Sequence, residues 1–205
     1  MRPDIGTFRS VWPEIDGALV REHLSRLGDG YFEAFEHQEI YQHLLSLGRL
    51  SPAHPVEVVF GAGRGDPVTC TVLAYDYPSE FSLITGILAA SGMNILAGDV
   101  FTYEKAREPA PAKSSGKRGL HGVRPAADPL RRRRIIDFFS GTLDTALSHA
   151  AWTEELRGRM ETVIGLLEQG GEASVKEAKQ KVNEMVVLRL AQLQTSAAPV
   201  LYPVR

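Results

Sequence analysis

The chain has 205 residues, 43% hydrophobic and 23% charged, with a formal net charge of only −2, so it is neither wholly disordered nor basic throughout. No apolar run reaches the ~18 residues of a membrane span, and the first residues lack the hydrophobic centre of a signal peptide. We therefore expect a cytoplasmic globular protein with no membrane partner.

Residues 1–55 are expected to form a helical N-terminal spacer. Apolar residues recur at helical spacing over residues 13–27 and again over 36–50. The aromatic residues between these segments are expected to pack them together: Tyr31, Phe32 and Phe35. The sequence SPAHP, residues 51–55, then ends the helical structure.

Two β-rich runs follow, VEVVF and VTCTVLAY, and GAGRGDP at residues 61–67 joins them. Its glycines invite comparison with a dinucleotide-binding loop, but that motif opens a helix. Here Asp66 and Pro67 lead into another strand, so we predict a hairpin turn. Cys70, inside the second run, is predicted to be a buried structural thiol rather than a nucleophile.

After the second of these strands, the pattern predicts a helix over 79–91 and a strand over 94–104. The composition then changes, because residues 105–134 carry ten basic side chains against two acidic ones and almost no large apolar residue. We predict a mobile basic insert over 105–131. One hypothesis is that the insert forms a lid, or a contact for an anionic partner, near the turn at Asp76–Ser79. The alternative is a solvated loop that ends in the basic residues Arg131–Arg134 at the start of the next strand.

The segment RRIIDFFSG, residues 133–141, resumes as a strand with apolar side chains on both sides. One helix then begins near Trp152 and ends at the Gly170-Gly171 pair, and a second opens at a capping box formed by Ser174 and Glu177. The final APVLYPVR is predicted to form a strand. We therefore expect residues 171–205 to form a helical extension and a terminal strand that could lead into a further domain.

From residue 68, the order strand, helix, strand, loop, strand, helix matches most of a ferredoxin-like unit, an antiparallel sheet with helices on one face. The predicted fold class is therefore α+β, with the sheet domain over residues 56–170. Each strand is expected to present one apolar face. The fourth strand is open to three assignments: PVLYPVR at the end of the chain, VEVVF before the unit, or a strand of a partner chain.

Residues 73–103, LAYDYPSEFSLITGILAASGMNILAGDVFTY, resemble an ACT domain, a small regulatory amino-acid-binding module with an Asp-x-Pro-Gly turn and an Asn-Ile strand start. Together with the helices before them, they are similar to the regulatory region of nitrogen-control enzymes of the PII uridylyltransferase and glutamine synthetase adenylyltransferase type. The nucleotidyltransferase and His-Asp phosphohydrolase motifs of that family are absent from this sequence. The resemblance implies a regulatory region without catalysis of its own, with an amino acid, glutamine, as the implied effector.

The candidate ligand site is the turn between the first strand and the first helix of this unit. The candidate residues are Asp76, Tyr77, Pro78, Ser79, Glu80, Phe81 and, carried over from the resemblance, Asn94. Amide groups at the start of the helix favour a carboxylate, and Asp76 can accept hydrogen bonds from an α-amino group. The alternative interpretation is that Asp76 only caps the helix, and Ser79 stands where the family has glycine.

Scattered histidines, and the lack of a nucleophile elbow or a phosphate loop, indicate no enzyme, no metal site and no cofactor. Arg131–Arg134 would attract nucleic acid electrostatically, but no recognition motif accompanies them, so nucleic acid is not an expected partner. The resemblance implies instead a homo-oligomer or a tandem domain partner. The alternative function is a degenerate ACT domain that serves dimerisation or assembly without a ligand.

Overall fold

The computed structural model describes residues 2–62, 67–105 and 132–196. Its elements in chain order are α1 (Ile5–Val11), α2 (Gly17–Arg26), α3 (Asp29–Ala34), α4 (His37–Arg49), β1 (Val56–Ala62), β2 (Val68–Tyr75), α5 (Glu80–Ala90), β3 (Met93–Thr102), β4 (Arg134–Leu143), α6 (His149–Gln169) and α7 (Gly171–Ser196). The fold is α+β, as predicted. The predicted insert, apart from its first residue, and the predicted terminal strand PVLYPVR lie outside the described residues.

The four strands form one sheet in the order β1-β2-β4-β3, and every neighbouring pair is antiparallel. β1 and β2 pair from Val56 with Ala74 to Ala62 with Val68, which confirms that GAGRGDP joins two strands rather than a strand and a helix. VEVVF, in β1, therefore takes the edge position beside β2 that the sequence left open among three segments.

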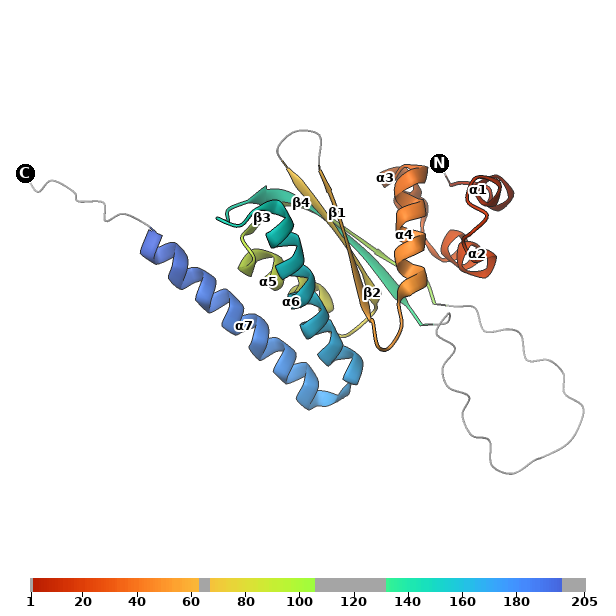
Figure 1. Ribbon diagram of the computed structural model, residues 1–205. Coiled ribbons are helices and arrows are strands. Elements are labelled where there is room, and N and C mark those ends of the chain that lie inside the picture. The colour runs from red at the N-terminus through yellow and green to blue at the C-terminus, as the bar shows by residue number, and fades with distance from the viewer. Residues whose placement is uncertain (1, 63–66, 106–131, 197–205) are drawn as a thin grey trace, which may run out of the picture.

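Helices cover both faces of the sheet, so the prediction of helices on one face is wrong. Figure 1 shows the sheet between two groups of helices, with α1–α4 on one side and α5–α7 on the other. Leu73 and Ile136 belong to the core under the N-terminal helices, whereas Val72 and Ile135 belong to the core under α5–α7. Adjacent residues of one strand thus point into two separate cores, because side chains alternate across a strand.

The N-terminal helices enclose an aromatic core. Tyr31, Phe32 and Phe35 are buried between α2 and α4, as predicted. Residues 5–11 form a helix that the pattern did not predict, with the Asp4 carboxylate accepting a hydrogen bond from the Thr7 amide at its N-terminus. The helices of the predicted N-terminal spacer share this core with Leu73 and Ile136, so they pack onto the sheet.

On the other face, α5 and α6 lie against the sheet and α7 packs against both of them. The contact between α5 and α7 is close, because a Cβ atom at Gly86 would lie only 2.6 Å from the Val182 side chain. α7 begins at Gly171, so Ser174 and Glu177 lie inside the helix and do not form the predicted capping box. Figure 1 shows the C-terminal half of α7 running outward from the body of the protein.

Candidate functional site

Hydrogen bonds close the turn that joins β2 to α5. The Asp76 amide donates to the Arg133 carbonyl at 3.0 Å, which extends the pairing of β2 with β4 by one residue. The Tyr77 amide donates to the Glu80 carboxylate, and the Glu80 amide donates to the Tyr77 carbonyl at 3.3 Å. The Glu80 amide, expected to be available to a ligand, is therefore used within the turn.

Ser79 has a left-handed backbone, with φ = 68° and ψ = 8°, and it is the one non-glycine residue with positive φ in the described part of the chain. Glycine is favoured in this region because it has no Cβ atom. Ser79 therefore keeps the conformation expected of glycine in an Asp-x-Pro-Gly turn, at a cost of about 1 kcal/mol. It is the N-cap of α5, but its side chain makes no capping hydrogen bond.

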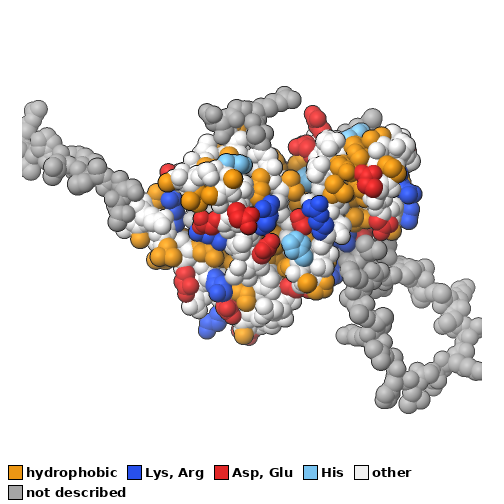
Figure 2. All heavy atoms as spheres, in the orientation of Figure 1, with side chains coloured by type: hydrophobic (Ala, Val, Ile, Leu, Met, Phe, Trp, Pro, Cys, Tyr) orange, Lys and Arg blue, Asp and Glu red, His pale blue; other side chains and the backbone are white. Residues whose placement is uncertain are grey.

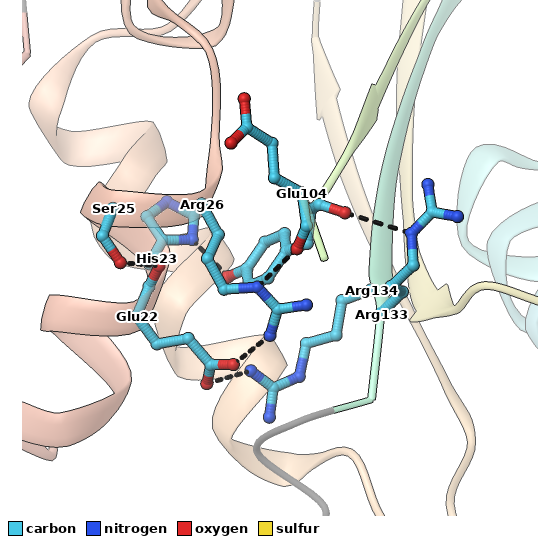
Figure 3. Close-up of polar contacts among 8 residues, drawn as sticks. Glu22, His23, Ser25, Arg26, Glu104, Arg133 and Arg134 are labelled. Atoms are coloured by element: carbon cyan, nitrogen blue, oxygen red, sulfur yellow. Dashed lines mark hydrogen bonds and ion pairs between the residues drawn. The ribbon is translucent and has the colours of Figure 1, made fainter. Parts of the chain in front are cut away.

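Asp76 pairs with Arg133 rather than capping α5. Arg133 Nη1 lies 2.9 Å from Asp76 Oδ2, and the two side chains are 42% and 29% exposed, so solvent reaches this ion pair. Arg133 Nε also donates to the Tyr103 carbonyl at 3.2 Å, which orients the guanidinium (Figure 3). A zwitterion would find two complementary charges here, with Asp76 facing an ammonium group and Arg133 facing a carboxylate.

Tyr77 connects the turn to α6. Its hydroxyl donates to Glu168 at 2.5 Å, and Arg132 donates to the same carboxylate from both Nη atoms, at 3.0 and 2.8 Å. Burial raises the pKa of Tyr77, and the hydrogen bond to Glu168 raises it further. Burial would raise the pKa of Glu168, but the hydrogen bonds from Arg132 and Tyr77 lower it on balance. Tyr77 therefore holds the turn in place.

Two further carboxyl groups lie near the turn. Glu80 is 7% exposed and Asp137 is fully buried, and neither oxygen of Asp137 has a hydrogen-bond partner within the described residues. Burial raises the pKa of Glu80 to about 7, against the effect of the Tyr77 amide and with help from the negative charges of Asp76 and Asp137. Burial, with Asp76 nearby, also raises the pKa of Asp137 to about 7. Both groups thus titrate near neutral pH.

Of the remaining predicted site residues, Pro78 is exposed in the turn, and Phe81 is 46% exposed and stacks on Phe139 at 6.1 Å. Asn94 is exposed but lies elsewhere. It pairs with Thr142 of β4, whereas the turn follows Tyr75, which pairs with Arg134. The two ends of the sheet are about 25 Å apart at roughly 3.3 Å per residue. β2 and β3 run parallel, so the start of β3, with Asn94, lies at the end of the sheet opposite to the turn that follows β2. Within a single copy of the chain, Asn94 therefore does not reach the turn.

A buried polar network joins the N-terminal helices to the sheet (Figure 3). Glu22 of α2 accepts hydrogen bonds from Arg26 of the same helix and from Arg134 at the start of β4, the latter at 3.1 Å. The side chains of Arg26 and Arg134 are 7% and 4% exposed. Arg26 Nε also donates to the Glu104 carbonyl at 2.7 Å. Two buried arginines thus share one carboxylate.

Two histidine–tyrosine pairs lie in the same core. His23 Nδ1 is 2.6 Å from the Tyr103 hydroxyl, and His43 Nδ1 is 2.8 Å from the Tyr31 hydroxyl. Burial lowers the pKa of His23 to about 3 and that of His43 to about 4. Both histidines are therefore neutral at neutral pH, and each connects its helix to a buried tyrosine.

The described arginines of the basic strand entry each contact an acidic residue of a different element. Arg132 pairs with Glu168, Arg133 with Asp76 and Arg134 with Glu22. On the face shown in Figure 2, acidic and basic side chains lie next to one another rather than in broad areas of one sign. These three arginines thus form ion pairs within the protein. Arg131 and the insert lie outside the described residues.

Sequence reasoning missed the partners that organise the turn, above all Arg133 and Glu168. One signal for Arg133 was available: if strand 134–141 pairs antiparallel with strand 68–75, residue 133 comes to lie opposite residue 76. Glu168 had no such signal, because it comes from a helix whose placement depends on tertiary packing.

The described residues include no cluster of His, Cys, Asp and Glu side chains that could hold a metal ion. None of the described helices combines the length and the apolar character that a membrane span requires. The sequence matches no family model and no curated protein.

Proposed function

We propose that the chain is a regulatory assembly module that pairs with a second copy through the free edge of β3. The proposal rests on the length of this strand, its low charge and its single partner strand. β3 is ten residues long, Asp99 is its one charged residue, and β4 is its one partner in the described sheet. Leu96 and Val100 are 64% and 50% exposed. A long apolar edge of this kind favours pairing with another strand.

β1 forms the opposite edge of the sheet and, unlike β3, is covered by helices of the same chain. β1 is packed between α4 on one face and α6 on the other. Phe60 of β1 lies against Trp152, and Arg157 donates to the Val58 carbonyl at 3.4 Å. The β1 edge is therefore protected by its own chain, whereas the β3 edge is left for a partner.

We further infer a ferredoxin-like sheet in which β1 takes the place of the fourth strand. Three features support this: the order β1-β2-β4-β3, the parallel direction of β2 and β3 connected through α5, and the position of α6 after β4. The arrangement agrees with the ACT resemblance, and such modules pair with further copies.

An amino-acid site between two copies is the second candidate function, and the separation of Asn94 from the turn favours it. If β3 pairs antiparallel with the β3 of a second copy, the start of the second β3 comes to the end of the sheet where the turn lies. The second copy's counterpart of Asn94 would then approach Asp76 and Arg133. The left-handed Ser79 supports the same reading, because it keeps the backbone shape of the ACT turn.

Sedimentation velocity over a range of concentrations tests the assembly. We expect the native chain to form dimers, and the double variant Leu96→Lys/Val100→Lys to weaken association at least tenfold, because it places like charges on the paired edges. Val187→Lys, at an equally exposed position on α7, is the matched control and should associate normally. A native chain that stays monomeric at several hundred micromolar would refute the proposal, as would a Val187→Lys variant that dissociates to the same extent.

A thermal-shift screen of the twenty amino acids, glutamine included, tests the second candidate. We expect one of them to raise the melting temperature of the native chain, and Asp76→Asn and Arg133→Gln each to abolish the rise. If no amino acid changes the melting temperature while dimers still form, the module assembles without a ligand at the turn.

A further inference from the structure

We propose that a hollow at the C-terminal end of α5 binds a small organic anion through its carboxylate. The hollow has a volume of about 420 Å³ and lies where α5, α6, α7 and the loop after β4 meet. Its polar lining comprises Ser91, Thr145, Glu155, Arg159, Arg189 and Gln192. This volume suits a molecule of metabolite size. The site lies at the other end of α5 from the Asp76 turn and does not depend on the function proposed above.

Arg159 of α6 is held in a fixed orientation at one wall. Its Nη1 donates to the Ala90 carbonyl at 3.2 Å and to the Ser91 hydroxyl at 3.0 Å, and its Nη2 pairs with Glu155. The contact with Ala90 satisfies a carbonyl group at the end of α5, where the last carbonyl groups have no donor within the helix. The guanidinium is therefore preorganised, and its Nε–H has no acceptor within the described residues.

Arg189 of α7 forms the facing wall. Its Nη2 donates to Asp144, both to the backbone carbonyl and to the carboxylate, the latter at 3.0 Å. A guanidinium carries five N–H donors in a rigid fork. Because Nη2 makes both contacts, Nη1 and Nε are left without an acceptor among the residues that the structure describes. Two arginines on different helices thus offer donors to one hollow.

The charge of the hollow favours an anion. The side chains of Arg189 and Arg159 are only 19% and 28% exposed, whereas those of Asp144 and Glu155 are 77% and 41% exposed. Solvent therefore screens the carboxylates more than the guanidinium groups, and the interior is left positive. The planar fork of arginine matches the two oxygens of a carboxylate.

A bound anion would add a link between three segments that line the hollow: the end of α5, the loop at residues 145–147, and α7. Arg189 lies in the C-terminal half of α7, the part that Figure 1 shows running outward from the body of the protein. The anion would therefore hold this part of α7 against α5. Its expected signature is slower hydrogen exchange in residues 185–192.

The test uses the full chain with acetate, glutarate and inorganic phosphate, each at 10 mM and constant ionic strength. We expect a carboxylate to raise the melting temperature by several degrees and to slow exchange in residues 185–192. Arg189→Gln should abolish both effects. Arg189→Lys, which keeps the charge but loses the fork, should weaken binding at least tenfold.

Arg157→Gln is the matched control, because Arg157 lies on the same helix as Arg159 but contacts Phe60 of β1. It should leave carboxylate binding unchanged. Circular dichroism of each variant without ligand checks its folding, and the exchange measurement on the native chain stands even if a variant unfolds. No response to either carboxylate, a response to phosphate alone, or an equal loss in Arg157→Gln would each overturn the proposal.

Discussion

Asp137 offers a sharp test of the electrostatics beneath α5. It is fully buried on β4 between Val72 of β2 and Val100 of β3, and its two oxygens have no hydrogen-bond partner within the described residues. Burial raises its pKa from 3.8 to about 7. The folded protein therefore holds the proton of this carboxyl group far more tightly than the unfolded chain does.

The size of the effect follows from linkage. A change of one in pKa corresponds to about 1.4 kcal/mol, so a rise from 3.8 to about 7 corresponds to about 4 kcal/mol. Because the folded pKa is raised, the stabilisation is complete below pH 4 and is lost as the pH rises through 7. Asp137→Asn has no proton to lose. Its buried amide costs about 1–3 kcal/mol at every pH, so the two stability curves should converge or cross as the pH rises.

Urea unfolding at pH 4, 5, 6, 7 and 8 measures this difference. We expect the free energy of unfolding of Asp137→Asn, relative to the native chain, to rise by about 4 kcal/mol from pH 4 to pH 8. Asp99→Asn, on the exposed part of β3, makes the same chemical change and is the control for the substitution itself. Parallel curves for Asp137→Asn would show that Asp137 is solvated or paired, and the account of this carboxyl group would be wrong.

Four further predictions concern stability. Ser79→Gly should raise the free energy of unfolding by up to about 1 kcal/mol in urea, because glycine removes the left-handed strain, whereas Ser79→Ala should give no gain. Glu22→Ala should lower it by about 3–5 kcal/mol by leaving Arg26 and Arg134 without their shared carboxylate, whereas Glu33→Ala, at an exposed position on α3, should change it by less than about 0.5 kcal/mol. Gly86→Ala should cost about 1–3 kcal/mol by pushing α7 from α5, and adding Val182→Ala should recover part of the loss. Burial lowers the pKa of His23 and His43, so their contribution to stability is present above pH 6.5 and is lost as the pH falls towards 4. His23→Gln should therefore reduce the loss of stability between pH 6.5 and pH 4. An unchanged loss of stability over this pH range would contradict the prediction.

Local patterns predicted most of the elements. The strand expected over 68–75 is β2, Val68–Tyr75, and the helix expected over 79–91 is α5, Glu80–Ala90. The helix at Ile5–Val11 escaped prediction although Ile5, Phe8 and Val11 recur at helical spacing, because the segment has only seven residues and buries only Phe8. Short helices of this kind are fixed by tertiary contacts rather than by their own sequence.

The second covered face of the sheet had a signal that was not used. The segment IIDFF places apolar side chains on both sides of its strand, and strands buried on both faces read as continuous apolar runs. That pattern should have predicted a second layer of helices. The candidate turn was located correctly as the junction of β2 and α5. Its ion pair with Arg133 followed only from the pairing of β4 with β2, and Glu168 was not predictable, because it reaches the turn from a helix distant in sequence.

Hydrogen–deuterium exchange of residues 93–102 at two protein concentrations tests the central proposal most directly. Half of the amide groups of an edge strand point away from its neighbour and exchange freely until a partner strand accepts them. We expect β3 to exchange at least tenfold more slowly at a protein concentration above the dissociation constant of the dimer than at one below it, while the exchange of α1 stays unchanged. Dimers that form with β3 exchanging as fast as in the monomer, or with protection confined to α7, would contradict the account.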